Sequence, residues 1–180
     1  MKSSRSSYFR IAIVVLVILA FGFTLAYAIS IGQTVSNVKI RDANNKPAYI
    51  PNLGSKVLSV FYNDADAADL NDPLADALKA KKFNEAKYQG IGIANLEDSK
   101  APNFIIRKIV QGKIEKYNST ILTDPDLILA KAWNLGNCNN TSVVVIIGKD
   151  KKVKYVHKGA VRGNEIKKVV DLVEVLIAGK

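Results

Sequence analysis

The feature that most restricts the fold of this 180-residue chain is a regular alternation of apolar strand patterns with helical patterns. Residues 56–62 (KVLSVFY) form a continuous run rich in β-branched and aromatic side chains, which predicts a strand covered on both faces. Asn71, Asp72 and Pro73 then predict the capped start of a helix that ends near Phe83. A buried strand followed by a helix is typical of an α/β protein.

The same pattern repeats further along the chain. Residues 88–96 predict a second core strand, and residues 101–117 predict a helix that follows it. The apolar face of this helix is expected to carry Ile105, Ile106, Ile109 and Val110. Residues 120–123 predict a short third strand, and residues 124–126 (Asp-Pro-Asp) predict the cap of a helix that runs to about Trp133, which we expect in the core.

Antiparallel strands are predicted at both ends of this region. Residues 31–51 indicate a strand pair joined by a turn, and residues 142–147 and 152–157 indicate a hairpin, before a final helix over residues 164–177. Helical connections require parallel strands, and the hairpin adds antiparallel ones. We therefore predict an α/β three-layer sandwich, with a central mixed sheet and helices on both faces, as a single domain over residues 29–180.

The first 28 residues have the layout of a secretory signal peptide. Basic residues without any acidic one precede an apolar run over residues 11–25, and Ala-Tyr-Ala follows at residues 26–28. The run is shorter than the roughly 20 residues that span a bilayer, and the small residues suit cleavage after Ala28. The alternative is an uncleaved membrane anchor, because Ile29 and Ile31 prolong the apolar stretch. The domain is expected to be exported in either case.

Charge and composition exclude several classes of site. The chain has 26 basic and 16 acidic residues, a net charge of +10, and removal of residues 1–28 would leave 23 basic residues and a net charge of +7. One cysteine, Cys138, and one histidine, His157, exclude an internal disulfide, a CxxC dithiol and the usual Cys or His metal sites. No triad or nucleophile elbow accompanies His157, so we expect it to be a solvated edge residue.

A basic stretch extends from Lys149 to Lys168 and includes Lys151, Lys152 and Lys154. Aromatic platforms for nucleic acid are nearly absent from it, because only Tyr155 is interleaved, and an exported protein rarely meets nucleic acid. The stretch either keeps the protein soluble as a solvated face, or binds an anionic envelope surface or an acidic partner protein.

Short motifs resemble those of the thioredoxin-like superfamily. Gly54-Ser55-Lys56 is similar to the residues that lead into the first core strand of its peroxiredoxin and thiol-reductase branches, and residues 123–133 resemble their third strand and the following helix. The pieces at residues 71–74, 87–89, 131–133, 142–145 and 158–160 resemble the YtfJ-type family of exported bacterial proteins. The resemblance covers roughly residues 30–178. It implies a thioredoxin-like fold and a periplasmic location, but no reaction, because the function of that family is unknown.

Two departures from the redox-active members affect the expected chemistry. Those members hold the catalytic cysteine at the start of the helix after the first core strand, whereas residues 63–69 contain none, and residues 139–142 lack the proline that is cis in the superfamily. We therefore expect a non-catalytic binding module without a cofactor. Its partner would be an unidentified envelope protein or an anionic envelope surface, not nucleic acid, and a membrane only if the N-terminal segment stays uncleaved and tethers the protein.

The expected partner-binding residues are Asp64, Asp66, Asp69, Asn139, Asn140, Lys151, Lys152 and Lys154. The three aspartates could also supply oxygen ligands to Ca²⁺, but they do not match an EF-hand loop. Capping and the helix dipole explain acidic residues at a helix start, so no metal is expected.

The alternative function is a single-cysteine thiol oxidoreductase that uses Cys138 and an external reductant. In a thioredoxin-like fold the loop over residues 136–140 approaches the edge where an active site would lie. The aspartates expected at the same corner would raise the pKa of the thiol, which favours a structural cysteine.

Overall fold

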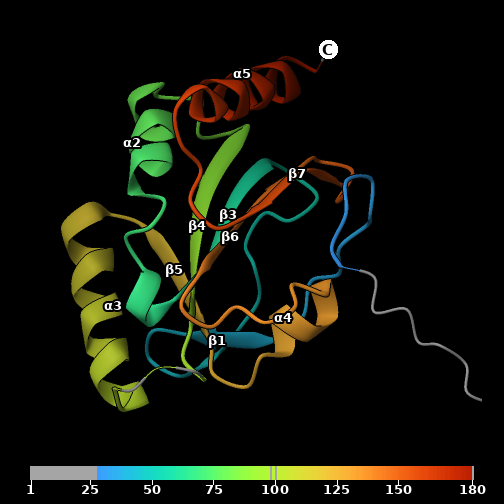
Figure 1. Cartoon of the computed structure of the whole chain (residues 1–180). Coiled ribbons are helices and arrows are strands. Elements are labelled where there is room, and N and C mark those ends of the chain that lie inside the picture. The colour runs from blue at the N-terminus through green and yellow to red at the C-terminus, as the bar shows by residue number, and fades with distance from the viewer. Residues whose placement is uncertain (1–27, 98, 100, 180) are drawn as a thin grey trace, which may run out of the picture.

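A computed structural model describes residues 28–97, 99 and 101–179, so the predicted signal peptide lies outside the described residues apart from Ala28. The described chain forms a seven-stranded mixed sheet of order β2-β1-β5-β4-β3-β6-β7 (Figure 1). The strands are β1 (Ile40–Asp42), β2 (Pro47–Ala48), β3 (Val57–Asp64), β4 (Tyr88–Asn95), β5 (Thr120–Asp124), β6 (Ser142–Ile147) and β7 (Val153–Lys158). β3, β4 and β5 are parallel, β6 and β7 form an antiparallel hairpin beside β3, and β1 pairs antiparallel with β5.

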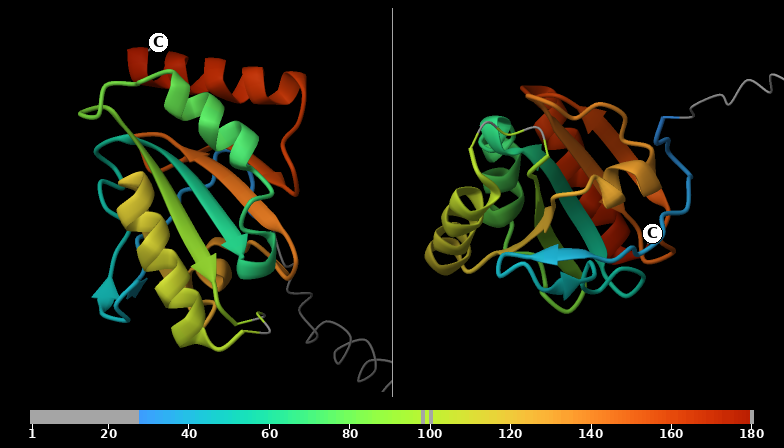
Figure 2. Two further views of the ribbon diagram at one scale, coloured as in Figure 1. Left: turned by 90° about the vertical axis from the view of Figure 1, so that its left-hand side faces the viewer. Right: turned by 90° about the horizontal axis from the view of Figure 1, so that it is seen from below.

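Helices cover both faces of this sheet, as predicted (Figure 2). They are α2 (Asp72–Ala80), α3 (Asn103–Tyr117) and α5 (Asn164–Ala178) on one face and α4 (Ile128–Trp133) on the other, and the 3-10 turn η1 (Ala65–Ala67) links β3 to α2. Side chains of β3 pack on both faces of the sheet because successive residues of a strand point to opposite faces. Leu58 and Val60 pack in the core that contains Trp133, whereas Val57 packs with Leu74 of α2 and with α5.

The start of α4 is held by a buried carboxylate at the end of β5. Asp124 accepts the backbone N–H groups of Ile128, Leu129 and Ala130 at 2.8, 3.0 and 3.2 Å, and the Tyr62 hydroxyl at 3.0 Å. These bonds satisfy N–H groups that have no partner within the helix. Asp124 of the predicted cap thus holds the helix start, but the N-cap position is Leu127 and the helix begins only at Ile128.

The start of α2 corrects the sequence prediction. Asn71 occupies the position before the helix, but its side chain makes no capping hydrogen bond, and the helix ends at Ala80 rather than near Phe83. The Asn71 amide instead reaches across the fold. It accepts the Val161 N–H at 2.8 Å and donates to the Gly159 carbonyl at 2.9 Å, which ties α2 to the segment that leads into α5.

α3 also differs from the prediction, because it has apolar side chains on two faces. Ile106 and Val110 are buried against the sheet, whereas Ile105 and Ile109 are 41% and 56% exposed, beside Phe104 at 68%. Ile105 and Ile109 each precede a buried residue by one position, a rotation of about 100° around the helix axis. The sheet covers a narrower arc than the apolar pattern fills, so half of the predicted apolar face lies outside the core.

Candidate functional site

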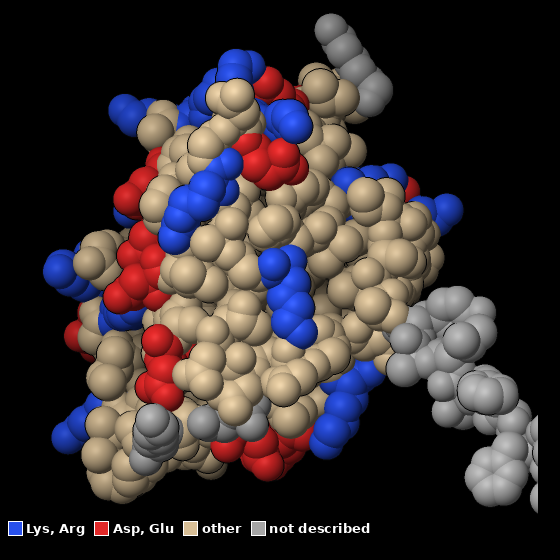
Figure 3. Space-filling model, in the orientation of Figure 1, with Lys and Arg blue, Asp and Glu red and all other residues tan. Residues whose placement is uncertain are grey.

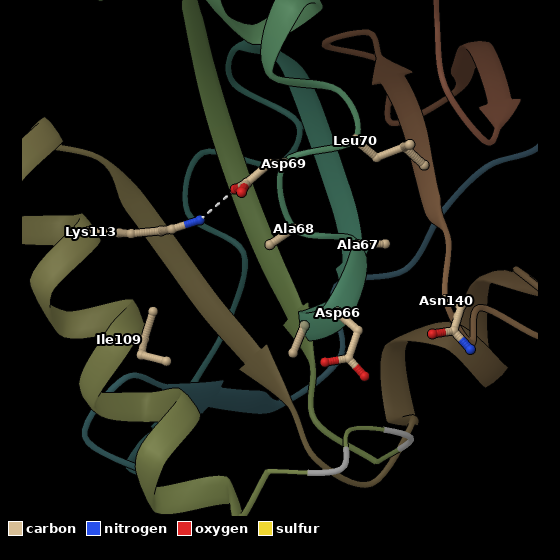
Figure 4. Close-up of a pocket in the computed structure, with 9 residues that line it drawn as sticks. Asp66, Ala67, Ala68, Asp69, Leu70, Ile109, Lys113 and Asn140 are labelled. Atoms are coloured by element: carbon tan, nitrogen blue, oxygen red, sulfur yellow. Dashed lines mark hydrogen bonds and ion pairs between the residues drawn. The ribbon is translucent and has the colours of Figure 1, made fainter.

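The segment after β3 forms a hollow at the carboxyl end of the parallel strands (Figure 4). The hollow has a volume of about 590 Å³ and lies between η1, α3 and the loop before β6. It is lined by Ala65, Asp66, Ala67, Ala68, Asp69, Leu70, Ile109, Lys113 and Asn140. We call it the β3-end hollow. Three sequence-predicted residues, Asp66, Asp69 and Asn140, meet in it.

Asp64, the last residue of β3, joins two walls of this hollow. Its carboxylate is fully buried and accepts the Asp66 N–H at 2.7 Å and the Asn140 N–H at 3.1 Å. Its own N–H donates to the Thr141 carbonyl at 3.0 Å. Because the carboxylate has no exposed surface, Asp64 cannot contact a partner directly. It is a positioning residue that fixes η1 against the loop before β6.

A network of hydrogen-bonded polar side chains connects the end of β3, the segment before α2 and the start of β6. The Asn71 amide donates to the Ser142 hydroxyl at 2.9 Å, and that hydroxyl donates to the Asn63 side-chain oxygen at 2.6 Å. The Asn63 amide in turn donates to the Ala68 carbonyl at 3.3 Å. These contacts pair polar groups that would otherwise be costly to bury. Sequence reasoning missed the network because its members lie in separate segments and form no local motif.

Negative charge gathers at the hollow and beside it. Asp69 pairs with Lys113 of α3 at 2.9 Å (Figure 4). Asp66, Asp72 and Asp76 are exposed. Burial, followed by the charge of Asp69, raises the pKa of Asp72; Lys113 lowers it, and Asp76 raises it by a smaller amount. The lining of the hollow contains two carboxylates, those of Asp66 and Asp69, and one ammonium group, that of Lys113.

The aspartates are not arranged as a metal site. In the ranges that the structure describes, no group of three or more His, Cys, Asp or Glu residues could hold a metal ion. Asp64 points into the protein toward backbone N–H groups, and Asp69 points toward Lys113 (Figure 4). Of the two explanations for this cluster, the bonds of Asp64 support capping.

α3 carries exposed apolar side chains, of which Ile109 lines the hollow. Ile109 lines the hollow and is 56% exposed, and Phe104 and Ile105 lie on the exposed side of the same helix. Gly112 adds no side chain to this side, and the space where a Cβ would lie is open. A signal for this surface exists in the sequence, because the apolar residues of α3 occupy a wider arc than one sheet can cover.

Cys138 does not lie in the hollow. It is 3% exposed and packs in the core with Trp133 and Leu135. Its Sγ donates to the Gly136 carbonyl at 3.5 Å and to the Leu135 carbonyl at 3.8 Å. The loop does approach the end of β3 through Asn140, as expected, but the thiol points into the core. A reactive cysteine needs access and a positive field, and burial denies this thiol access.

Of the basic stretch, Lys151 and Lys152 lie at the other end of the sheet, whereas Arg162 donates to the Leu70 carbonyl at the hollow at 2.8 Å. β6 runs antiparallel to β3, so Ser142 pairs near Asp64 and the hairpin tip with Lys151 and Lys152 lies beside the start of β3. Lys154 is paired with Asp150 at 2.7 Å. Figure 3 shows acidic side chains over α2 and η1 and basic side chains over the hairpin tip. The expected partner-binding residues therefore form two separate groups, with Asn139 exposed beside Asn140 in the first.

His157 lies on the edge strand β7, where its ring stacks on that of Tyr155 at 6.4 Å between centroids. It is half-buried and, through its pairing with Val144 of β6, lies level with Phe61 in the sheet, two strands away from β3. Stacking on the Tyr155 ring gives the His157 ring a packing contact on the edge strand. This placement agrees with the edge residue expected from the sequence.

The strand order and the helices on both faces define a thioredoxin-like fold. Solved structures share this fold. Protein SMc02350 of Sinorhizobium meliloti has a TM-score of 0.63 at 14% identity, covering 86% of this chain and 87% of that one. The exposed lipoprotein thioredoxin Etrx1 of Streptococcus pneumoniae has a TM-score of 0.57 at 13% identity, covering 76% and 99%.

Sequence similarity identifies the particular family. The model of a family described as "Bacterial protein of unknown function (YtfJ_HI0045)" matches residues 53–176, and the chain belongs to this family. An uncharacterised Haemophilus influenzae protein is 27% identical over 164 residues, which cover 83% of this chain and 88% of that protein. The uncharacterised protein YtfJ of Escherichia coli is 27% identical over 124 residues, covering 68% and 66%. The family resemblance seen in the sequence is thus confirmed.

Proposed function

We propose that this chain is an exported, non-catalytic thioredoxin-like protein that binds a partner protein of the bacterial envelope through the β3-end hollow. One observation carries the proposal. The segment over residues 65–70, where redox-active members of the superfamily begin the cysteine-bearing helix, has no cysteine and instead lines a hollow beside the exposed side chain of Ile109. A concave site lined by apolar side chains and a few polar groups is typical of a binding site.

Export is supported by the layout of the first 28 residues and by the contacts of the residue that follows them. The Ile29 N–H donates to the Asn134 carbonyl at 3.0 Å, and its side chain packs against the core. Cleavage after Ala28 therefore removes none of these contacts. No helix in residues 28–97 or 101–179 is long and apolar enough to cross a membrane. Intact-mass spectrometry of the native protein tests this step, with a chain that starts at Ile29 as the expected result.

The burial of Cys138 supports a role without thiol chemistry. The alternative oxidoreductase requires the Sγ atom to reach a substrate disulfide, and its 3% exposure opposes that attack. We expect no thiol-disulfide exchange activity from the purified protein. An activity that is present in the wild type and lost in Cys138→Ser would establish the alternative.

Site-specific photo-crosslinking tests the location of binding. A photoreactive p-benzoylphenylalanine replaces Ile109, which lines the hollow, or Val175, which is a comparably exposed apolar residue of α5 at 47%. In intact cells, position 109 is expected to give a discrete protein adduct that position 175 does not give. Equal adducts from both positions, or adducts from position 175 alone, would contradict the proposal.

A further inference from the structure

The β3-end hollow offers apolar and acidic groups within one small surface. Ala67, Ala68 and Leu70 line it from one side and Ile109 from the other, and none of these four side chains is fully buried. Its volume of about 590 Å³ is within the range of ligand pockets, roughly 300–1,000 Å³. An apolar side chain of a partner would be covered by these residues and removed from water, which favours binding.

The carboxylates at the same place are only partly compensated. Lys113 contacts one oxygen of Asp69, whose side chain is still 77% exposed, and Asp66 is exposed with no described ion pair. The raised pKa of Asp72, to which Asp69 contributes after burial, records repulsion between carboxylates. The whole chain has a net charge of +10, so these acidic residues form a negative region on a basic protein.

We infer that the partner of this hollow is a protein segment in which an apolar side chain is flanked by lysine or arginine. This inference rests on the proposed function and adds the chemistry of the partner to it. The apolar side chain would lie against Leu70 and Ile109, and the flanking cations would lie beside Asp66 and Asp69. Cations at these positions would relieve the repulsion among the carboxylates, and they would fix the register of the segment.

The same charges disfavour an anionic occupant at this place. Phosphate groups of a lipid surface or of a nucleic acid would lie beside Asp66 and Asp69, and like charges in such an arrangement are unfavourable. Lys151 and Lys152, at the hairpin tip, are at the opposite end of β3. A contact with an anionic surface would therefore use another part of the molecule than the hollow.

Three synthetic peptides test the inference by NMR titration of the labelled domain. The first contains Lys-Leu-Lys between Gly-Ser and Ser-Gly ends, the second has Glu-Leu-Glu, and the third has Lys-Ser-Lys. The first peptide is expected to shift the backbone amides of residues 65–70 and of Asn140, and to bind about tenfold more tightly than either other peptide.

Each other outcome has a defined meaning. Binding of the acidic peptide to the same amides with equal or higher affinity would overturn the inference and leave the proposed binding site intact. Shifts confined to the hairpin tip would overturn both proposals. Absence of any shift at about 1 mM of every peptide would also overturn the inference, because the charge and apolar contributions would then be too weak to matter.

A matched pair of variants separates local charge from overall charge. Asp66→Lys and Glu85→Lys change the net charge equally, but Glu85 is exposed in the turn before β4, away from the hollow. Asp66→Lys is expected to remove the roughly tenfold preference for the basic peptide, and Glu85→Lys is expected to keep it. An equal loss in both variants would show a non-specific charge effect and would overturn the inference.

Discussion

Replacement of Asp64 should loosen the binding hollow and destabilise the protein. The buried carboxylate accepts the N–H groups of Asp66 and Asn140, and no water can replace it without entering the core. A hydrogen bond to a charged group contributes about 1.5–3 kcal/mol, so Asp64→Ala, which removes two, should lower the free energy of unfolding by about 3–6 kcal/mol. Asp64→Asn keeps one acceptor oxygen and should lose about half of that amount.

Urea unfolding and amide hydrogen exchange together measure this effect. In Asp64→Ala, the exchange of the Asp66 and Asn140 amides should accelerate more than that of Val145, a buried residue in the middle of β6. A stability of Asp64→Ala within about 0.5 kcal/mol of the wild type would refute the positioning role. Unchanged protection of the two amides would refute it as well.

Four further predictions concern the scaffold. Asp124→Asn places an amide beside N–H donors of α4, and urea unfolding should show a loss of about 1–3 kcal/mol. Cys138 should react with iodoacetamide at least about tenfold more slowly in the native protein than in urea, as measured by mass spectrometry. The folded-state pKa of Asp72 is raised, so ionised Asp72 destabilises the folded protein at pH values above its unfolded-state pKa. Asp72→Asn should therefore raise the thermal midpoint at pH 7, and this gain should vanish well below pH 3.8. Burial, then Glu165, raises the pKa of Tyr155 to about 12, so stability should fall as pH rises from 10 toward 12, and less steeply in Tyr155→Phe.

The strands and their order follow from patterns that are local in the sequence. β3 is an unbroken apolar run because both of its faces are covered, and that run was sufficient to predict a central strand. α3 shows the limit of the same reasoning. Its sequence specifies which residues are apolar, but only the width of the packed sheet decides that Ile106 is buried and Ile105 is not.

The hollow was predictable only in part. Asp66, Asp69 and Asn140 were expected at one edge because the fold brings the end of β3 beside the loop before β6. The inward orientation of Asp64 and the bonds of Asn71 to Ser142 depend on segments far apart in the chain, for which no single sequence offers a signal. Ile109 joins the site from α3 only because the helix presents a second apolar face.

If function resides in the hollow and not in the thiol, crosslinking from position 109 should depend on the hollow alone. The adduct formed from position 109 in intact cells is compared in the wild type and in three variants: Ala68→Arg, whose side chain fills the hollow, Cys138→Ser, and Ala80→Arg at the end of α2, a control for the added charge. We expect Ala68→Arg to abolish the adduct and the other two variants to retain it. An adduct that survives Ala68→Arg but disappears in Cys138→Ser would show that function depends on the thiol.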